Sequence, residues 1–247
     1  MNNETMTAMV GMVLRGSRLP IACCAALTAA VLVGGCARVV AGTARVGDAH
    51  VAPARPIPVA DLLIEPSRFP AQYPAAALPP KDVDRALGEI DGVPAGSEVT
   101  PPECAPLPVL AEQRAAVQGT DDESGSRLIV TVARPVPSIR ARVTQLTDCP
   151  TYTSTAAGDA GEVSEVTVDL PPAPPVDADD SYAVDQTVTA ESAAEPNTRT
   201  LTLVALIDDV RVTASWQQHG SSDDPDTEAL DALFTEAVLK VRKEIPR

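Results

Sequence analysis

The chain has 247 residues; 45% are hydrophobic but only 2% are aromatic, and 34 acidic residues against 19 basic ones give a formal net charge of -15. A protein that neutralises nucleic-acid phosphates needs clustered lysine and arginine, so this charge argues against a nucleic-acid partner. One Trp, three Tyr and two Phe also leave little surface for stacking bases or sugar rings.

The N-terminus has the three parts of a bacterial export signal, followed directly by Cys36. These parts are a positive region with Arg15 and Arg18, the apolar run from Leu19 to Val33, and the small residues Gly34 and Gly35. The ending from Val33 to Cys36 resembles a lipobox, with Val where Leu is commonest, in which the cysteine is acylated. We therefore expect residues 1–35 to be a lipoprotein signal peptide and Cys36 to carry acyl chains such as palmitate.

A retained transmembrane anchor is the alternative interpretation of the same segment. About 20 apolar residues are needed to span a bilayer. The run from Leu19 to Gly35 is shorter and ends in small residues rather than in a basic stop signal. Lipidation is therefore favoured, and it would hold the protein on the extracytoplasmic face of the cell membrane.

Two cysteines remain for the exported part of the chain. Of five cysteines, Cys23 and Cys24 lie in the signal and Cys36 would carry lipid, which leaves Cys104 and Cys149. In an oxidising compartment such a pair is expected to form a disulfide. A metal site is the weaker interpretation, because two thiols without neighbouring histidines fall short of four ligands.

Residues 36–80 are predicted to form a Pro-rich tether, and residues 81–247 a single folded domain. Closely spaced prolines block both helices and central strands. The later half of the tether, which includes residues 61–64 and 69–73, is apolar enough to lie against the domain. The prolines are Pro53, Pro56, Pro58, Pro66, Pro70, Pro74, Pro79 and Pro80.

Hydrophobic periodicity and turn residues predict the elements of the domain. The helices are expected at residues 81–90, ended by Gly92, and at residues 108–117 and 138–146. The strands are expected at residues 127–133, at 162–170 with a bulge, and at 182–189.

The clearest pattern is the β-hairpin over residues 200–216, with Asp208-Asp209 as its turn. A C-terminal helix follows, with Asp224 as its cap, Pro225 in its first turn and an apolar stripe at spacings of 3 and 4 up to Ile245. The expected fold is α+β: a single antiparallel sheet packed by the C-terminal helix and short N-terminal helices, with one disulfide.

Neither of the two histidines predicts a catalytic site. His50 lies in the tether, where nothing rigid would position it. His219 is followed closely by Ser221, Ser222, Asp223 and Asp224, but neighbours in a loop rarely converge into a triad and no G-x-S-x-G elbow is present. A polar turn that caps the next helix is the favoured interpretation, so we expect no catalytic residue.

The acidic clusters at residues 121–123, 177–180 and 223–226 raise the question of calcium loops. None has the D-x-D-x-D-G spacing, so solvated turns are favoured. Phosphate-binding glycines are also absent from the sequence, and no metal or cofactor is expected. Trp216 ends a predicted strand beside an amphipathic helix, which favours a core position over a place in a ligand groove.

Several features occur together in this chain: the lipobox from Val33 to Cys36, the sequence GTAR at Gly42 to Arg45, the helix at Asp82 to Gly88, the Cys104 and Cys149 pair, and the hairpin ALIDDVRVTAS with its closing helix. In these the chain resembles small exported lipoproteins of mycobacteria and related actinobacteria. Its second half is similar to the extracellular sensor domain of the PknH type of serine/threonine kinase, although those sensors typically have two disulfides and a kinase attached. The resemblance implies an α+β fold and an extracytoplasmic location.

The leading functional hypothesis is a non-enzymatic, lipid-anchored binding or sensor-like domain of the cell envelope, with an unidentified ligand or protein partner. The alternative is a lipid or glycolipid carrier with an apolar cavity between the C-terminal helix and the sheet; a hydrolase comes third. The other face of the sheet is expected to meet water, because small polar residues alternate along its strands. They include Thr131, Thr187, Thr202 and Thr213. A protein partner is expected to use either this polar face or the Pro-rich loops.

Overall fold

The structure is a computed structural model that describes residues 57–107, 113–134, 136, 138–158, 161–191, 197–220 and 224–245. The chain divides into two compact units, Met1–Ala52 and Pro53–Arg247, and the described residues all belong to the second. The predictions for the signal peptide, for lipidation of Cys36 and for His50 lie outside the described residues.

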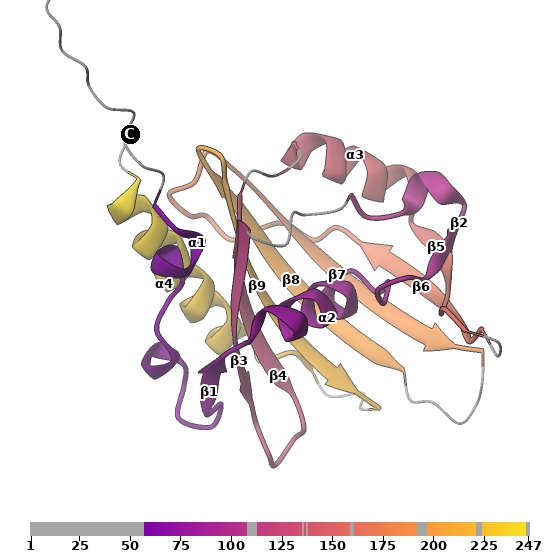
Figure 1. Cartoon of the computed structure of the whole chain (residues 1–247), viewed down its shortest axis with the longest axis horizontal. Coiled ribbons are helices and arrows are strands. Elements are labelled where there is room, and N and C mark those ends of the chain that lie inside the picture. Colours follow the sequence, from indigo (N-terminus) through magenta and orange to yellow (C-terminus); the bar gives the residue numbers. More distant parts are fainter. Residues whose placement is uncertain are drawn as a thin grey trace, which may run out of the picture. The chain divides into compact units, whose positions relative to one another are not determined.

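The strands form one antiparallel sheet, in the order β1-β3-β4-β9-β8-β7-β6-β5-β2 (Figure 1). Their bounds are β1 Ala75–Ala77, β2 Glu98–Thr100, β3 Arg114–Thr120, β4 Arg127–Ala133, β5 Thr151–Thr155, β6 Val163–Asp169, β7 Asp180–Ala190, β8 Thr198–Ile207 and β9 Val210–His219. The predicted hairpin is β8 and β9, closed by the Ile207–Val210 pair with Asp208 at a φ of 56°. Asp tolerates this left-handed conformation, which the tight turn requires.

Helices flank the sheet, which confirms the predicted α+β class. They are α1 Val59–Leu62, α2 Pro80–Ile90, α3 Ile139–Asp148 and α4 Thr227–Glu244, with short 3-10 helices η1 Pro66–Arg68 and η2 Pro102–Cys104. The predicted cap of α4 was wrong by two residues: Asp226, not Asp224, accepts a hydrogen bond from the Ala229 N–H at 3.1 Å. The Tyr73 hydroxyl also donates to Asp226, at 3.3 Å, and helps to hold it in that position.

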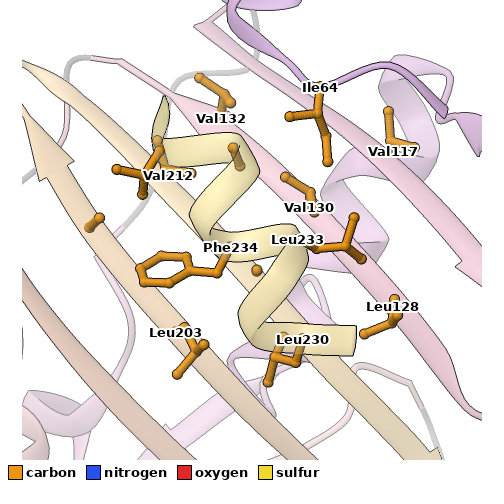
Figure 2. Close-up of a cluster of buried hydrophobic side chains, with 14 of the residues drawn as sticks. Ile64, Val117, Leu128, Val130, Val132, Leu203, Val212, Leu230, Leu233 and Phe234 are labelled. Atoms are coloured by element: carbon orange, nitrogen blue, oxygen red, sulfur yellow. The ribbon is translucent and has the colours of Figure 1, made fainter. Parts of the chain in front are cut away.

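Helix α4 covers one face of the sheet. Figure 2 shows Leu230, Leu233 and Phe234 pointing from the helix toward side chains of β4, β8 and β9. Trp216 belongs to the same cluster and is 2% exposed, which confirms its predicted core position. The segment ahead of α2 adds further buried members to this cluster, so packing begins before residue 81. These members are Leu62, Ile64, Phe69 and Tyr73.

The opposite face is covered by α2, α3 and the segment between α2 and η2. Ala86 and Ile90 of α2 pack on Ile129 of β4, and Figure 1 shows α2 crossing in front of the strands. Leu146 of α3 packs with Tyr152 around the disulfide. The structure contains the predicted disulfide, which joins Cys104 in η2 to Cys149 at the end of α3 with a Cα–Cα distance of 5.8 Å.

The expectation that this second face meets water was wrong. Thr131, Thr202 and Thr213 are only 1%, 6% and 5% exposed. The polar groups are satisfied within the protein, because Thr202 and Ser215 share a hydrogen bond of 2.9 Å between their hydroxyls. Gln186 and Gln217 also donate to backbone carbonyls of Ile90 and Glu89 at the end of α2. Polar side chains on this face therefore fasten a helix instead of facing solvent.

Two further sequence-based predictions differ from the structure. Residues 114–117 were expected to be helical but begin strand β3, because pairing with β1 and β4 on both sides overrides the helix propensity of the alanines. Residues 108–112 of that predicted helix lie outside the described part. Strand β6 has no bulge: its pairs with β5 and β7 run without interruption, and Val163 lies on the other face from Val166 and Val168.

Candidate functional site

The covered face of the sheet contains a cleft beneath α2 and α3. A small inner cavity of about 40 Å³ has Tyr182, Val204 and Arg211 in its floor and Leu87 and Arg142 in its roof. A larger groove of about 340 Å³ adjoins it and shares Leu87 and Arg211, as well as Asp91. We call the inner cavity and this groove the central cleft.

Strand alternation places the floor residues. In β9, Val210 and Val212 belong to the α4 cluster, so Arg211 and Thr213 lie on the opposite face. The antiparallel register sets Thr213 of β9 against Val204 of β8, and Val204 against Tyr182 of β7. Three neighbouring strands therefore contribute to the same floor.

The roof is held by a polar network centred on Arg142, whose side chain is 12% exposed. Its guanidinium forms an ion pair with Asp91 at 3.2 Å and donates to Gln145 at 2.6 Å. Gln145 in turn donates to the carbonyls of Glu103 and Ala105. This network links the end of α2, η2 with the residue that follows it, and α3.

Gly92 makes the turn that ends α2 above this floor. Its φ is 68°, which favours glycine, and a Cβ atom there would lie 2.6 Å from Nε2 of Gln186. The predicted helix end at Gly92 is confirmed, and its reason is both the left-handed backbone and the close approach of the sheet.

Two tyrosines of the cleft region stay protonated. Burial raises the pKa of Tyr152 to about 12 and also raises the pKa of Tyr182. The hydroxyl of Tyr152 donates to the Asp91 carbonyl at 3.0 Å. A neutral phenol is a hydrogen-bond donor, so Tyr182 brings an O–H group to the cleft.

Arg211 differs from Arg142, the other arginine of the inner cavity, in having no hydrogen-bond or ion-pair partner among the described residues. Its Nε atom is buried without a hydrogen bond. The described part of the chain also offers its guanidinium no ion pair, whereas Arg142 is paired with Asp91. An unpaired cation is thus held at the floor of the cleft.

A second cavity, of about 230 Å³, lies beside the end of α2 and is lined by hydroxyl groups and by His219. Because an arginine only donates, Nε2 of His219 accepts from Arg127 at 2.8 Å, and Nδ1–H donates to Thr198 Oγ1 at 2.7 Å. Partial burial and the charge of Arg127 lower the pKa of His219. The described partners of His219 are therefore on β4 and β8. Residues 221–223, which the sequence analysis considered as triad partners of His219, lie outside the described part.

The acidic clusters serve turns and caps. Asp121 accepts from the Glu123 N–H at 3.0 Å and from the Ser124 hydroxyl at 2.6 Å. Asp179 accepts from the Asp208 N–H at 2.7 Å and thereby supports the hairpin turn. Within the described ranges, no group of three or more His, Cys, Asp or Glu side chains is arranged to hold a metal ion. No helix among the described residues has the length and apolar character to cross a membrane.

A family model matches residues 59–242, which include every strand of the described sheet, helices α1 to α3 and all but the last two residues of α4. The chain belongs to the family described as Domain of unknown function (DUF5642). No curated protein matches the chain.

Two solved structures are similar to this DUF5642 chain. One is an uncharacterised protein from Mycobacterium smegmatis (Rv0999 ortholog), at 18% identity and a TM-score of 0.42, with 71% of this chain and 92% of that one covered. The other is the extracellular domain of PknH from Mycobacterium tuberculosis, at 14% identity and a TM-score of 0.40, with 73% of this chain and 98% of that one covered.

Sequence reasoning did not single out the cleft residues of this DUF5642 domain. Arg142 and Arg211 lie in a predicted helix and a predicted strand, where each resembles an ordinary solvated charge. One signal was present: Arg211 alternates with Val210 and Val212, which places it on the same face as Thr213. That face was expected to meet water, where an arginine side chain is ordinary and does not indicate a binding site.

Proposed function

We propose that this protein is a lipid-anchored, extracytoplasmic binding domain without catalytic activity, which takes a small polar ligand in the central cleft. The observation that carries the proposal is the cleft itself: two helices cover a polar sheet face and leave a cavity that joins a groove. Ligand sites are typically concave, with a few polar groups placed among apolar ones. Tyr182, Arg211 and Thr213 beside Leu87 and Val204 match that description.

The extracytoplasmic location is supported by the lipobox at Val33 to Cys36 and by the Cys104–Cys149 disulfide. Disulfides persist in oxidising compartments and are rare in the cytosol. A binding role in the envelope requires no catalytic group. The described partners of His219, the residue that invited a triad interpretation, are Arg127 and Thr198.

The alternative function, a carrier for lipid chains, has less support. It requires an apolar cavity between α4 and the sheet. Leu230, Leu233 and Phe234 are at most 2% exposed and pack directly on the strands. The cleft on the opposite face has charged and hydroxyl groups in its lining, which suit a polar ligand better than acyl chains.

Native mass spectrometry of the full chain, extracted from membranes in detergent, tests the binding proposal. We expect a co-purified small molecule in the wild type and in Lys81→Trp, an exposed position of α2. Leu87→Trp, which fills the cleft from the same helix, should lose it. A bound lipid that persists in Leu87→Trp and is lost in Leu233→Trp would replace the proposal with the carrier.

The mass of the mature N-terminus tests the anchor. We expect diacylglyceryl mass on Cys36 and its loss in Cys36→Ala, together with release of the protein from the membrane fraction. A mature N-terminus elsewhere without lipid would contradict the anchor and leave the cleft proposal to its own test.

A further inference from the structure

We propose that Arg211, with Arg142 and Tyr182, recognises a single oxyanion group, a carboxylate or a phosphate, on the ligand of the central cleft. The inference rests on the proposed function and names the chemistry of its ligand.

The first step is the charge of Arg211. The side chain is half-buried, and its Nε atom is out of contact with water. A guanidinium that is partly removed from water without a counter-charge is unfavourable, so such arginines are normally paired. The chain has 34 acidic residues, and yet none within the described ranges pairs with Arg211. Other arginines that reach inward are paired, as Arg134 is with Asp209 and Arg242 is with Asp179. An unsatisfied buried donor calls for an explanation, and a ligand that arrives from outside supplies one.

The second step is the balance of charges in the inner cavity. Its lining contains Arg142, Arg211 and Asp91 as the charged residues. Asp91 forms the ion pair with Arg142 at 3.2 Å, so one positive charge remains uncompensated. A single anionic group on the ligand would neutralise it.

The third step is the supply of donors. A guanidinium binds carboxylates and phosphates through two parallel N–H groups, which favours these flat or tetrahedral oxyanions over chloride. Tyr182 lines the same cavity, and its phenol is neutral and able to donate. Arg142 is already held in place by Asp91 and Gln145, so little side-chain freedom is lost when the anion arrives.

The last step is size. A single water needs roughly 10 to 15 Å³, so the inner cavity of about 40 Å³ holds one small group and not a whole molecule. The adjoining groove of about 340 Å³ has Leu87, Val93 and Leu107 in its walls. The ligand therefore has one acidic group for the cavity and a partly apolar remainder for the groove.

Anion titration of the full chain tests the inference, with sodium phosphate and sodium acetate as probes against sodium chloride at constant ionic strength. Arginine Nε–H signals in 15N NMR report the site directly. We expect either probe to shift the Nε signals of Arg211 and Arg142 and to raise the Tm. The probe that acts more strongly identifies the group as phosphate or carboxylate.

Two matched variants carry the control. Arg211→Gln should weaken the response to the effective probe about tenfold or more, because a charge-assisted bidentate contact is lost. Arg140→Gln makes the same change on α3, where the side chain is 89% exposed, and should respond as the wild type does. Retention of the full response in Arg211→Gln would overturn the inference, as would the lack of a specific response to either probe in the wild type.

A stability comparison separates binding from a structural role. In chloride alone, Arg211→Gln should leave the Tm unchanged or raised, because it removes an unpaired charge. Arg142→Gln should lower the Tm, because it leaves Asp91 without its partner. An equal loss of Tm in both variants would show that Arg211 has a structural partner and would overturn the inference. A co-purified ligand that survives Arg211→Gln would refute the oxyanion site alone, whereas a cleft that binds nothing would refute the proposed function as well.

Discussion

Arg211 and His219 lie on the same face of β9, eight positions apart in one strand, and show how neighbours set the role of a polar residue. Arg211 has no described partner, and it faces the central cleft. His219 is hydrogen-bonded through both ring nitrogens, which fixes it in one neutral tautomer. Arg211 is therefore available to bind a ligand, whereas His219 has a structural role.

His219 makes the stability of the protein depend on pH. Its folded-state pKa is lowered by partial burial and by Arg127, so the unfolded chain binds a proton more readily than the folded one. The free energy of unfolding should therefore fall as the pH drops from above about 6.5 toward the lowered folded value, and rise with pH in that window. Thermal unfolding between about pH 7.5 and about pH 5.5 measures this dependence.

The control for this prediction is the other histidine of the chain. His219→Gln should reduce the change in Tm between the two pH values, and His50→Gln should leave it unaltered. Identical pH dependences in the wild type and His219→Gln would contradict the assignment.

At the scale of elements, α4 and α2 are held to the sheet by different forces. Helix α4 is attached by apolar packing, in which Leu233 and Phe234 are 2% and 0% exposed. The end of α2 is attached by hydrogen bonds from Gln186 and Gln217 of the sheet to its last carbonyls. The apolar face is therefore closely packed, and the polar face leaves room for the cleft.

Leucine truncation on α4 tests this difference within one helix. Leu233→Ala should lower the free energy of unfolding by about 2 to 5 kcal/mol, because it leaves a cavity in the core. Leu239→Ala removes the same atoms at a position that is 57% exposed and should change stability by less than about 0.5 kcal/mol. Urea unfolding of both variants gives the values, and equal losses would refute the packing described.

For the whole molecule, the disulfide is a covalent link between the segment that follows α2 and the end of α3. It spans a sequence separation of 45 residues and joins η2 to the end of α3. The cluster around it contains Leu146 and Tyr152 and is separate from the α4 cluster. The disulfide therefore stabilises one side of the molecule.

Replacing both cysteines by alanine should lower the free energy of unfolding by about 4 kcal/mol in the chain-entropy account. Amide hydrogen exchange should rise most in α3 and around η2, and least in α4, because α4 packs on the other face. Reduction of the wild type with subsequent thiol blocking should give the same pattern, and oxidised protein treated with the blocking reagent is the control. Uniform loss of protection across both faces would contradict the local role.

The sequence by itself determined the elements that depend on neighbours along the chain. Alternation over residues 200–216 predicted β8 and β9, and the spacing of apolar residues predicted α2, α3 and the stripe of α4. The expected signal peptide and lipidation account for Cys23, Cys24 and Cys36, so the disulfide between the other two cysteines was predicted from a count. These features are local, or have a single solution, and tertiary packing did not change them.

Only the tertiary structure decided what covers the polar face. The alanine-rich residues of β3 became a strand because β1 and β4 lie on either side, and such pairing joins segments far apart in the chain. The central cleft also joins segments that are far apart in the chain, because Arg142, Tyr182 and Arg211 come from α3, β7 and β9. Each looks like a solvated surface residue within its own segment, because burial and the lack of a partner are properties of the packed sheet and helices together.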